Sequence, residues 1–183
     1  MDTVRYFKDL SKTRLKALRA AGEAMALQRV QHDVAVEAGY RSWDDLLHAD
    51  DIDRQLAVVM TMEPSLNFNG FGPGSFAKSI EERKRNFADW RAELRRRAQH
   101  VDEVRLWLLA NVVPRATRNP DAYSYRLKHL AEEGLGGYVA NGEVIAAAII
   151  AGYAYKPDGN DSPNATFAMS SKSINSLLAL RNS

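Results

Sequence analysis

The 183-residue sequence contains no cysteine, which excludes disulfides, thiolate metal sites, iron–sulfur clusters and cysteine nucleophiles. It also lacks an excess of one charge, because 25 basic and 23 acidic side chains give a formal net charge of +2. No stretch approaches the roughly 18 consecutive apolar residues of a membrane span, and the first residues lack the apolar run of a secretion signal. We therefore expect a cytosolic (cytoplasmic), globular protein that is stabilised by its hydrophobic core and does not contact membranes.

The first 50 residues have the pattern of a three-helix module. Apolar residues recur at helical spacing in three runs, Gly39 predicts a left-handed cap after the second run, and Ser42 can cap a short third helix. A small helix-turn-helix is the alternative interpretation. Eight basic and eight acidic residues in positions 1–50 give the module no positive excess for binding phosphates, so three packed helices are favoured.

The pattern Q-x-x-x-A-x-x-x-G-Y-x-S-W-x-x-L runs from Gln31 through Trp43 to Leu46. It resembles a short helical module found at the front of many otherwise unrelated bacterial proteins. The resemblance covers about a quarter of the chain and implies little about activity. Tyr40 and Trp43 are therefore interpreted as core anchors, since buried aromatic side chains supply the largest apolar areas.

Residues 51–78 are predicted to form a short helix followed by an aromatic loop rich in glycine, proline and asparagine. Leu66, Phe68, Phe71 and Phe76 make this loop too apolar for a flexible linker, so we expect it to be held on the body by these side chains. A phosphate-binding loop is excluded, because neither the Walker spacing nor the G-x-G-x-x-G context is present.

Residues 79–108 are predicted to form one long helix, capped by Ser79 with Glu82 and followed by Pro114. Its polar side carries seven basic residues against four acidic ones, the clearest basic excess in the chain. One interpretation is a solvated face with pairs such as Glu93 to Arg97. The other is a basic stripe that binds a phosphate backbone or an acidic protein.

The remaining pattern predicts three further helices and a hairpin in a domain spanning residues 79–183. Asp121 or Ser124 can cap a helix, Asn141 can cap a second helix that is apolar on all sides, and a hairpin over 153–155 and 166–169 precedes a final helix. The expected fold class is therefore mainly α, a helical bundle with a small C-terminal β-hairpin. This order is that of a winged helix-turn-helix, but Glu143 is the only polar side chain in positions 142–152, which disfavours base reading.

A second cluster interleaves cationic and aromatic side chains between residues 115 and 129. Such a mixture suits contact with the backbone or with unpaired bases of a nucleic acid better than reading of duplex sequence. This prediction requires the cationic side chains to converge on a single surface. The candidate residues for binding nucleic acid or a protein partner are Arg91, Arg95, Arg115, Arg118, Tyr123, Tyr125, Arg126, Lys128 and His129.

Two motifs in this half, S-Y-x-L-K-H from Ser124 to His129 and Y-V-x-N-G-E from Tyr138 to Glu143, resemble a group of uncharacterised proteins carried by phages and plasmids. The resemblance spans roughly residues 114–170. It implies an accessory role on a mobile element, where small proteins bind nucleic acid or block a host defence complex.

An enzymatic function has weak support in the sequence. His129 and Glu132 lie three residues apart on one helix face, where they can form a metal-binding or general-base pair, and Ser124 is a nearby hydroxyl without a nucleophile elbow. We therefore expect a non-enzymatic protein without cofactor or metal that contacts nucleic acid or a nucleoprotein. The alternative is a protein-binding inhibitor of a host defence complex that uses helix 142–152 or the aromatic loop.

Overall fold

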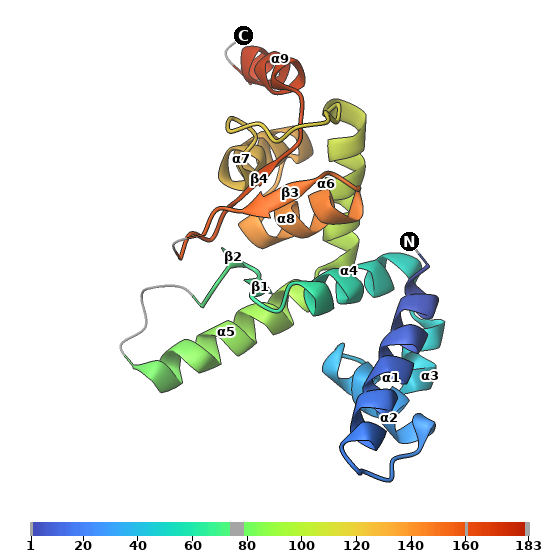
Figure 1. Ribbon diagram of the computed structural model, residues 1–183. Coiled ribbons are helices and arrows are strands. Elements are labelled where there is room, and N and C mark those ends of the chain that lie inside the picture. The colour runs from blue at the N-terminus through green and yellow to red at the C-terminus, as the bar shows by residue number, and fades with distance from the viewer. Residues whose placement is uncertain (1, 74–78, 160, 182–183) are drawn as a thin grey trace. The chain divides into compact units, whose positions relative to one another are not determined.

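The computed structural model describes residues 2–73, 79–159 and 161–181. The fold is mainly α with two short antiparallel strand pairs, one of them a C-terminal β-hairpin, which confirms the predicted class (Figure 1). The chain divides into two compact units, Met1–Met62 and Glu63–Ser183. Within the described ranges no helix combines the length and the apolar character needed to cross a bilayer.

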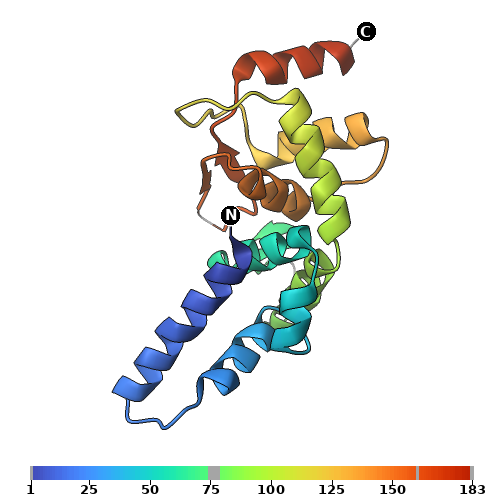
Figure 2. The same ribbon diagram turned by 90° about the vertical axis from the view of Figure 1, so that its right-hand side faces the viewer.

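The N-terminal unit contains α1 (Thr3–Ala20), α2 (Leu27–Glu37), α3 (Trp43–His48) and α4 (Asp51–Met62). Helices α1 and α2 lie side by side, and α4 packs against α1 (Figure 2). The predicted caps are present, because Gly39 has a φ of 91° after α2 and the Oγ of Ser42 accepts a hydrogen bond from the Asp45 N–H at 3.0 Å. The unit extends to Met62 rather than ending near residue 50, because Ala57 and Val58 of α4 belong to its hydrophobic core.

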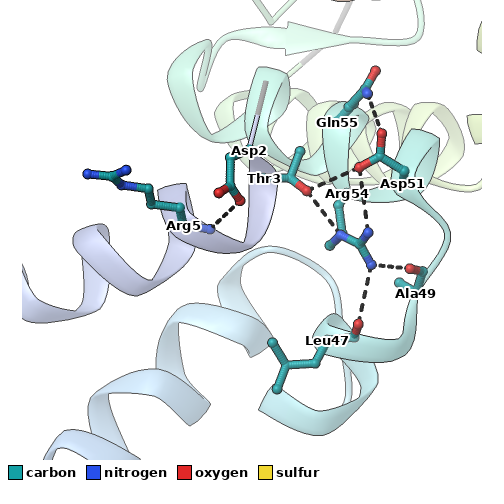
Figure 3. Close-up of polar contacts among 8 residues, drawn as sticks. All are labelled: Asp2, Thr3, Arg5, Leu47, Ala49, Asp51, Arg54 and Gln55. Atoms are coloured by element: carbon teal, nitrogen blue, oxygen red, sulfur yellow. Dashed lines mark hydrogen bonds and ion pairs between the residues drawn. The ribbon is translucent and has the colours of Figure 1, made fainter.

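Arg54 joins three parts of this unit in a way that the sequence pattern does not reveal (Figure 3). Its guanidinium donates to the hydroxyl of Thr3 at 3.0 Å and to the carbonyl oxygens of Leu47 and Ala49, and it pairs with Asp51 at 3.5 Å. Only 14% of the Arg54 side chain is exposed. The start of α1, the end of α3 and the start of α4 are therefore held by one cation.

The C-terminal unit is built around α8 (Asn141–Ile150), which packs against α6 (Ala98–Asn111) and α7 (Ser124–Leu135). The helix that was predicted to be apolar on all sides lies in the interior of the unit, because every residue from Asn141 to Ala148 is buried. The remaining helix, α9 (Ser171–Arg181), contacts α7. The buried part of α8, up to Ala148, therefore has no face left for another protein.

The prediction of one long helix over residues 79–108 is wrong. The chain forms α5 (Ile80–Arg95) and then α6, which run in different directions (Figure 1). Arg96 ends α5, and Arg97, with a ψ of 20°, is the N-cap of α6. The two helices pack against different partners, α5 against β1 (Leu66–Asn67) and α6 against α8. The apolar spacing continues through the break, so it did not reveal the change in direction.

The aromatic loop is held on the C-terminal unit as predicted, although its centre is a two-stranded turn. Strand β1 pairs with β2 (Gly70–Phe71), and Leu66 and Phe71 are both buried; Phe76 lies outside the described residues. The turn covers the start of α8, because the Gly142 N–H donates to the carbonyl of Phe68 at 3.0 Å. A Cβ atom at Gly142 would overlap the carbonyl oxygen of Asn67, so glycine permits this close approach.

Strands β3 (Tyr155–Pro157) and β4 (Ala165–Phe167) form the C-terminal hairpin, with Tyr155 opposite Phe167.

Two predicted helix caps are wrong. Residues Tyr123 and Ala140 occupy the N-cap positions of α7 and α8, while Ser124 and Asn141 are their first helical residues. The reason is that both predicted caps bond elsewhere: the Ser124 hydroxyl contacts the hairpin and the Asn141 amide contacts the β1–β2 turn and the hairpin.

Candidate nucleic-acid interface

Two aromatic rings with a cationic side chain at each end form a row in the C-terminal unit. The Cζ of Arg97 lies 5.4 Å from the ring centre of Phe68, whose ring lies 6.4 Å from that of Tyr138. The Nζ of Lys128 lies 4.6 Å from the ring centre of Tyr138. We call Arg97, Phe68, Tyr138 and Lys128 the aromatic–cation row. Because these residues come from α6, the β1–β2 turn, the α7–α8 loop and α7, only the tertiary fold brings them together.

Tyr125 adds a second exposed ring beside the row. Tyr125 and Tyr138 are 52% and 62% exposed. The Tyr125 ring packs edge-on against His129 at 4.6 Å, one turn further along α7. The two tyrosines therefore present stacking surface to solvent.

Tyr125, Lys128 and Tyr138 also line a pocket of about 440 Å³. Its remaining lining residues are Asn69, Asn141, Pro163 and Asn164, which come from the β1–β2 turn, the first residue of α8 and the loop before β4. This volume lies within the range of about 300–1,000 Å³ that is usual for small-molecule sites.

Glu132 holds the side chains of Lys128 and His129 on α7. One carboxylate oxygen accepts from Lys128 Nζ at 2.6 Å and from the Val139 N–H at 3.2 Å, and the other lies 2.9 Å from Nδ1 of His129. Burial raises the pKa of Glu132, but the hydrogen bonds from Lys128 and Val139, the charge of Lys128 and the His129 contact outweigh it and lower that pKa. The positive charge of Lys128 is therefore largely compensated inside the protein.

The predicted site residues fall into three groups. Tyr125 and Lys128 line the pocket, and His129 contacts Tyr125. Tyr123 and Arg126 form a separate pair, in which the guanidinium lies 5.1 Å from the ring centre and 3.6 Å from the carboxylate of Asp121. The other predicted residues are not among the lining residues of the pocket: Arg91, Arg95, Arg115 and Arg118.

Arg91 stabilises the loop that leads into β1. Its Nη1 donates to the carbonyl oxygens of Glu63, Pro64 and Leu66 at 3.3, 2.7 and 2.8 Å, and burial lowers its pKa. Arg115 and Arg118 are exposed in the loop before α7, and Arg95 is half-buried at the end of α5. The cations that were expected to form one surface are thus distributed, because several of them serve internal contacts.

The residues that sequence reasoning missed are Phe68, Asn69, Arg97, Tyr138 and Asn164. Tyr138 lies in the Y-V-x-N-G-E motif and Phe68 in the aromatic loop, so each carried a weak signal. Tyr138 is 10 residues from Lys128, whereas the other four lie 31 to 60 residues from it, and periodicity does not report contacts between such distant segments.

The Ser124 hydroxyl, which had suggested a nucleophile near His129, is bonded to other residues. The Oγ of Ser124 is buried, donates to Asn164 at 3.3 Å and accepts from the Ala165 N–H at 3.2 Å, so it is not presented to His129. His100 forms another carboxylate pair, with Nδ1 2.8 Å from the fully buried Glu143. Among the described residues no group of three histidine, aspartate or glutamate side chains could hold a metal ion.

The exposed apolar side chains that could meet a protein partner lie mainly on α6 rather than on helix 142–152. Within the expected contact helix 142–152, the residues up to Ala148 are buried, so only its last turn reaches the surface. Helix α6 instead exposes Leu106 and Leu109, and Val113 follows two residues after its end; each is at least half exposed. Leu106 and Leu109 are three residues apart and share one face of α6, and we refer to these two side chains together with Val113 as the exposed patch.

Comparisons of the chain with models of protein families, with curated proteins and with solved structures find no match. Function is therefore inferred from the side chains of the site.

Proposed function

We propose that the C-terminal unit binds single-stranded nucleic acid by stacking unpaired bases on its exposed tyrosines. The observation that carries the proposal is the aromatic–cation row beside Tyr125, in which two neighbouring rings have a cation at each end and adjacent members lie 4.6 to 6.4 Å apart. Proteins that bind single strands without strong sequence preference combine aromatic stacking platforms with cationic side chains that follow the backbone.

The charges of the row favour single strands over duplexes. Lys128 is paired with Glu132, and Arg97 lies 2.9 Å from Glu93, so each cation is partly compensated by a carboxylate. Duplex binding depends mainly on neutralising phosphates, whereas an unpaired strand also gains from base stacking. Stacking on Tyr125, Tyr138 and Phe68 is therefore the main source of affinity in this proposal.

The proposal extends to the biological role. It describes a non-enzymatic, cytoplasmic accessory protein of a mobile element, in line with the resemblance of the S-Y-x-L-K-H and Y-V-x-N-G-E motifs to phage- and plasmid-borne proteins. Its partner is nucleic acid or a nucleoprotein with exposed single strands.

Titration of fluorescent single-stranded DNA, single-stranded RNA and duplex DNA with the full chain tests this function. Tyr138→Ala and Tyr125→Ala should each weaken single-strand binding about 5- to 150-fold, because stacking contributes about 1–3 kcal/mol per base. Leu109→Ala is the matched control, since its side chain is 50% exposed and does not line the pocket. It should leave the affinity unchanged.

The salt dependence gives a second readout. If the row neutralises about one or two phosphates, the logarithm of the binding constant should fall with the logarithm of the salt concentration with a slope of about −1. Absence of single-strand binding at low salt would refute the proposal. Equal affinity of Tyr138→Ala and the unaltered protein would refute it as well.

The exposed patch of Leu106, Leu109 and Val113 supports a second candidate, a protein-binding inhibitor that acts without nucleic acid. Co-purification from host extract with and without nuclease separates the two. A complex that survives nuclease and is lost in Leu106→Glu favours the inhibitor, whereas a complex that nuclease removes favours the nucleic-acid role.

A further inference from the structure

We infer that the pocket between Tyr125 and Tyr138 accepts a single unstacked nucleobase and recognises its edge by asparagine amides. This inference rests on the proposed binding of single strands and deepens it, because it assigns one subsite with its own chemistry. The pocket volume of about 440 Å³ accommodates a planar base with part of its sugar.

The walls of the pocket suit a flat, aromatic ligand. Two tyrosine rings and Pro163 supply apolar surface. The Nζ of Lys128 lies over the Tyr138 ring, 4.6 Å from its centre. Unstacked bases of single strands are recognised by aromatic rings together with hydrogen bonds to their edges. A ring that is more than half exposed gains contact area when such a base covers it.

The polar groups of the pocket are mainly neutral amides. Asn141 is held in place, because its Nδ2 donates to the Asn69 carbonyl at 3.3 Å, the Pro163 carbonyl at 3.0 Å and Asn164 Oδ1 at 3.1 Å. The Oδ1 of Asn141 is buried and has no hydrogen-bond partner in the part of the chain that the structure describes. The floor of the pocket is therefore preorganised by a side chain that is itself 93% buried, since only 7% of it is exposed.

Two further amides are available at the rim. Asn69 is exposed, and its side chain bonds to none of the described residues. Asn164 uses Oδ1 for Asn141 and for the Ser124 hydroxyl, which leaves its Nδ2 as a donor. Asparagine amides carry both donors and acceptors, which match the donor and acceptor pairs on the edges of nucleobases.

Charge distinguishes a base site from a phosphate site. Among the described residues that line the pocket, Lys128 is the only cationic one, and its Nζ lies 2.6 Å from the Glu132 carboxylate. A phosphate placed here would meet a compensated cation, whereas a neutral base avoids the nearby carboxylate. The base is therefore the group that occupies the pocket, and the phosphates lie outside it.

The experiment uses nucleoside monophosphates as probes of the full chain, monitored by NMR chemical-shift changes. AMP, GMP, CMP and UMP are titrated separately, and ribose 5-phosphate serves as the probe without a base. We expect saturable shifts with at least one nucleotide and none with ribose 5-phosphate. Equal binding of ribose 5-phosphate would overturn the inference, because the pocket would then recognise phosphate.

Asn69→Ala tests the amide contribution without disturbing the fold, since this side chain is exposed. Loss of one hydrogen bond should weaken the preferred nucleotide about 2- to 12-fold. Asn175→Ala, at an exposed position of α9, is the matched control and should bind as the unaltered protein does. Unchanged nucleotide affinity in both Asn69→Ala and Tyr138→Ala would overturn the inference.

The two proposals fail in different ways. Binding of oligonucleotides without any response to the four nucleotides at millimolar concentration overturns the base pocket and leaves the single-strand function in place. Nucleotide binding without oligonucleotide binding supports the pocket and overturns the single-strand function.

Discussion

Gly142→Ala is the substitution for which the structure predicts the least intuitive result. Within helices alanine is ordinarily more stable than glycine by about 1 kcal/mol. At this position the added methyl group would overlap the Asn67 carbonyl oxygen and lie 2.8 Å from that of Phe68. Both obstacles are backbone atoms of the β1–β2 turn, so neither can move away as a flexible side chain would.

The expected cost exceeds the helical gain. Overpacking of a dense interior costs about 1–3 kcal/mol, and strain on the hydrogen bond from Gly142 N–H to Phe68 adds about 0.5–1.5 kcal/mol. After subtraction of the ordinary gain from alanine, the free energy of unfolding of the C-terminal unit should fall by about 2 kcal/mol. The displaced turn carries Asn69, so nucleotide binding should weaken as well.

Urea unfolding followed by tryptophan fluorescence measures this effect, because Trp90 and Trp107 both lie in the C-terminal unit. Gly137→Ala is the matched control, since a Cβ atom there meets nothing within 4 Å. We expect a lower urea midpoint for Gly142→Ala and little change for Gly137→Ala. Equal or greater stability of Gly142→Ala would show that the turn does not press on the start of α8.

Three further outcomes follow from side chains with internal partners. Arg91→Met should lower the free energy of unfolding by about 2–4 kcal/mol, because three backbone carbonyls lose a charged donor. Urea titration measures this change. An unchanged urea midpoint would contradict the role of Arg91 in holding the loop before β1. Arg54→Met should destabilise the N-terminal unit by about 3 kcal/mol, which thermal unfolding followed by Trp43 fluorescence would detect. Because the pKa of Glu132 is lowered in the folded protein, its contribution to stability is present above the pKa of the unfolded chain and is lost as the pH falls through the folded pKa. Glu132→Gln should therefore flatten the loss of stability between about pH 5 and pH 3, and an unaltered pH profile would contradict this assignment.

Local signals in the sequence predict the local structure well. Gly39, Ser42 and Ser79 end or begin helices as their chemistry indicates, and the apolar run after Asn141 is an interior helix. The break after α5 was missed, because Leu94, Ala98 and Val101 keep helical spacing across it. Spacing reports which side chains are buried, and it does not report against which element they are buried.

In the candidate site, too, the sequence identified residues that are neighbours along the chain and missed contacts between distant segments. Tyr125 and Lys128 were found because they are close in the sequence, and they line the pocket together. Arg91 was placed in the site on the basis of its charge, although the carbonyl groups of residues 63–66 take up its donors. Phe68 and Arg97 were missed, because a contact between the β1–β2 turn and the start of α6 follows from the packing of α8 and from no pattern in either segment.

The alanines Ala146, Ala147 and Ala148 at the centre of α8 are completely buried, as are Val144 and Ile145 before them. Their amide protons should be the slowest in the chain to exchange with deuterated solvent, because they open only when the whole unit unfolds. Because protein interiors are densely packed, a larger residue at these fully buried positions would overpack the interior, so the positions should tolerate little change. We therefore expect that random mutagenesis with selection for folded protein would leave this short segment almost unaltered while surface positions diversify.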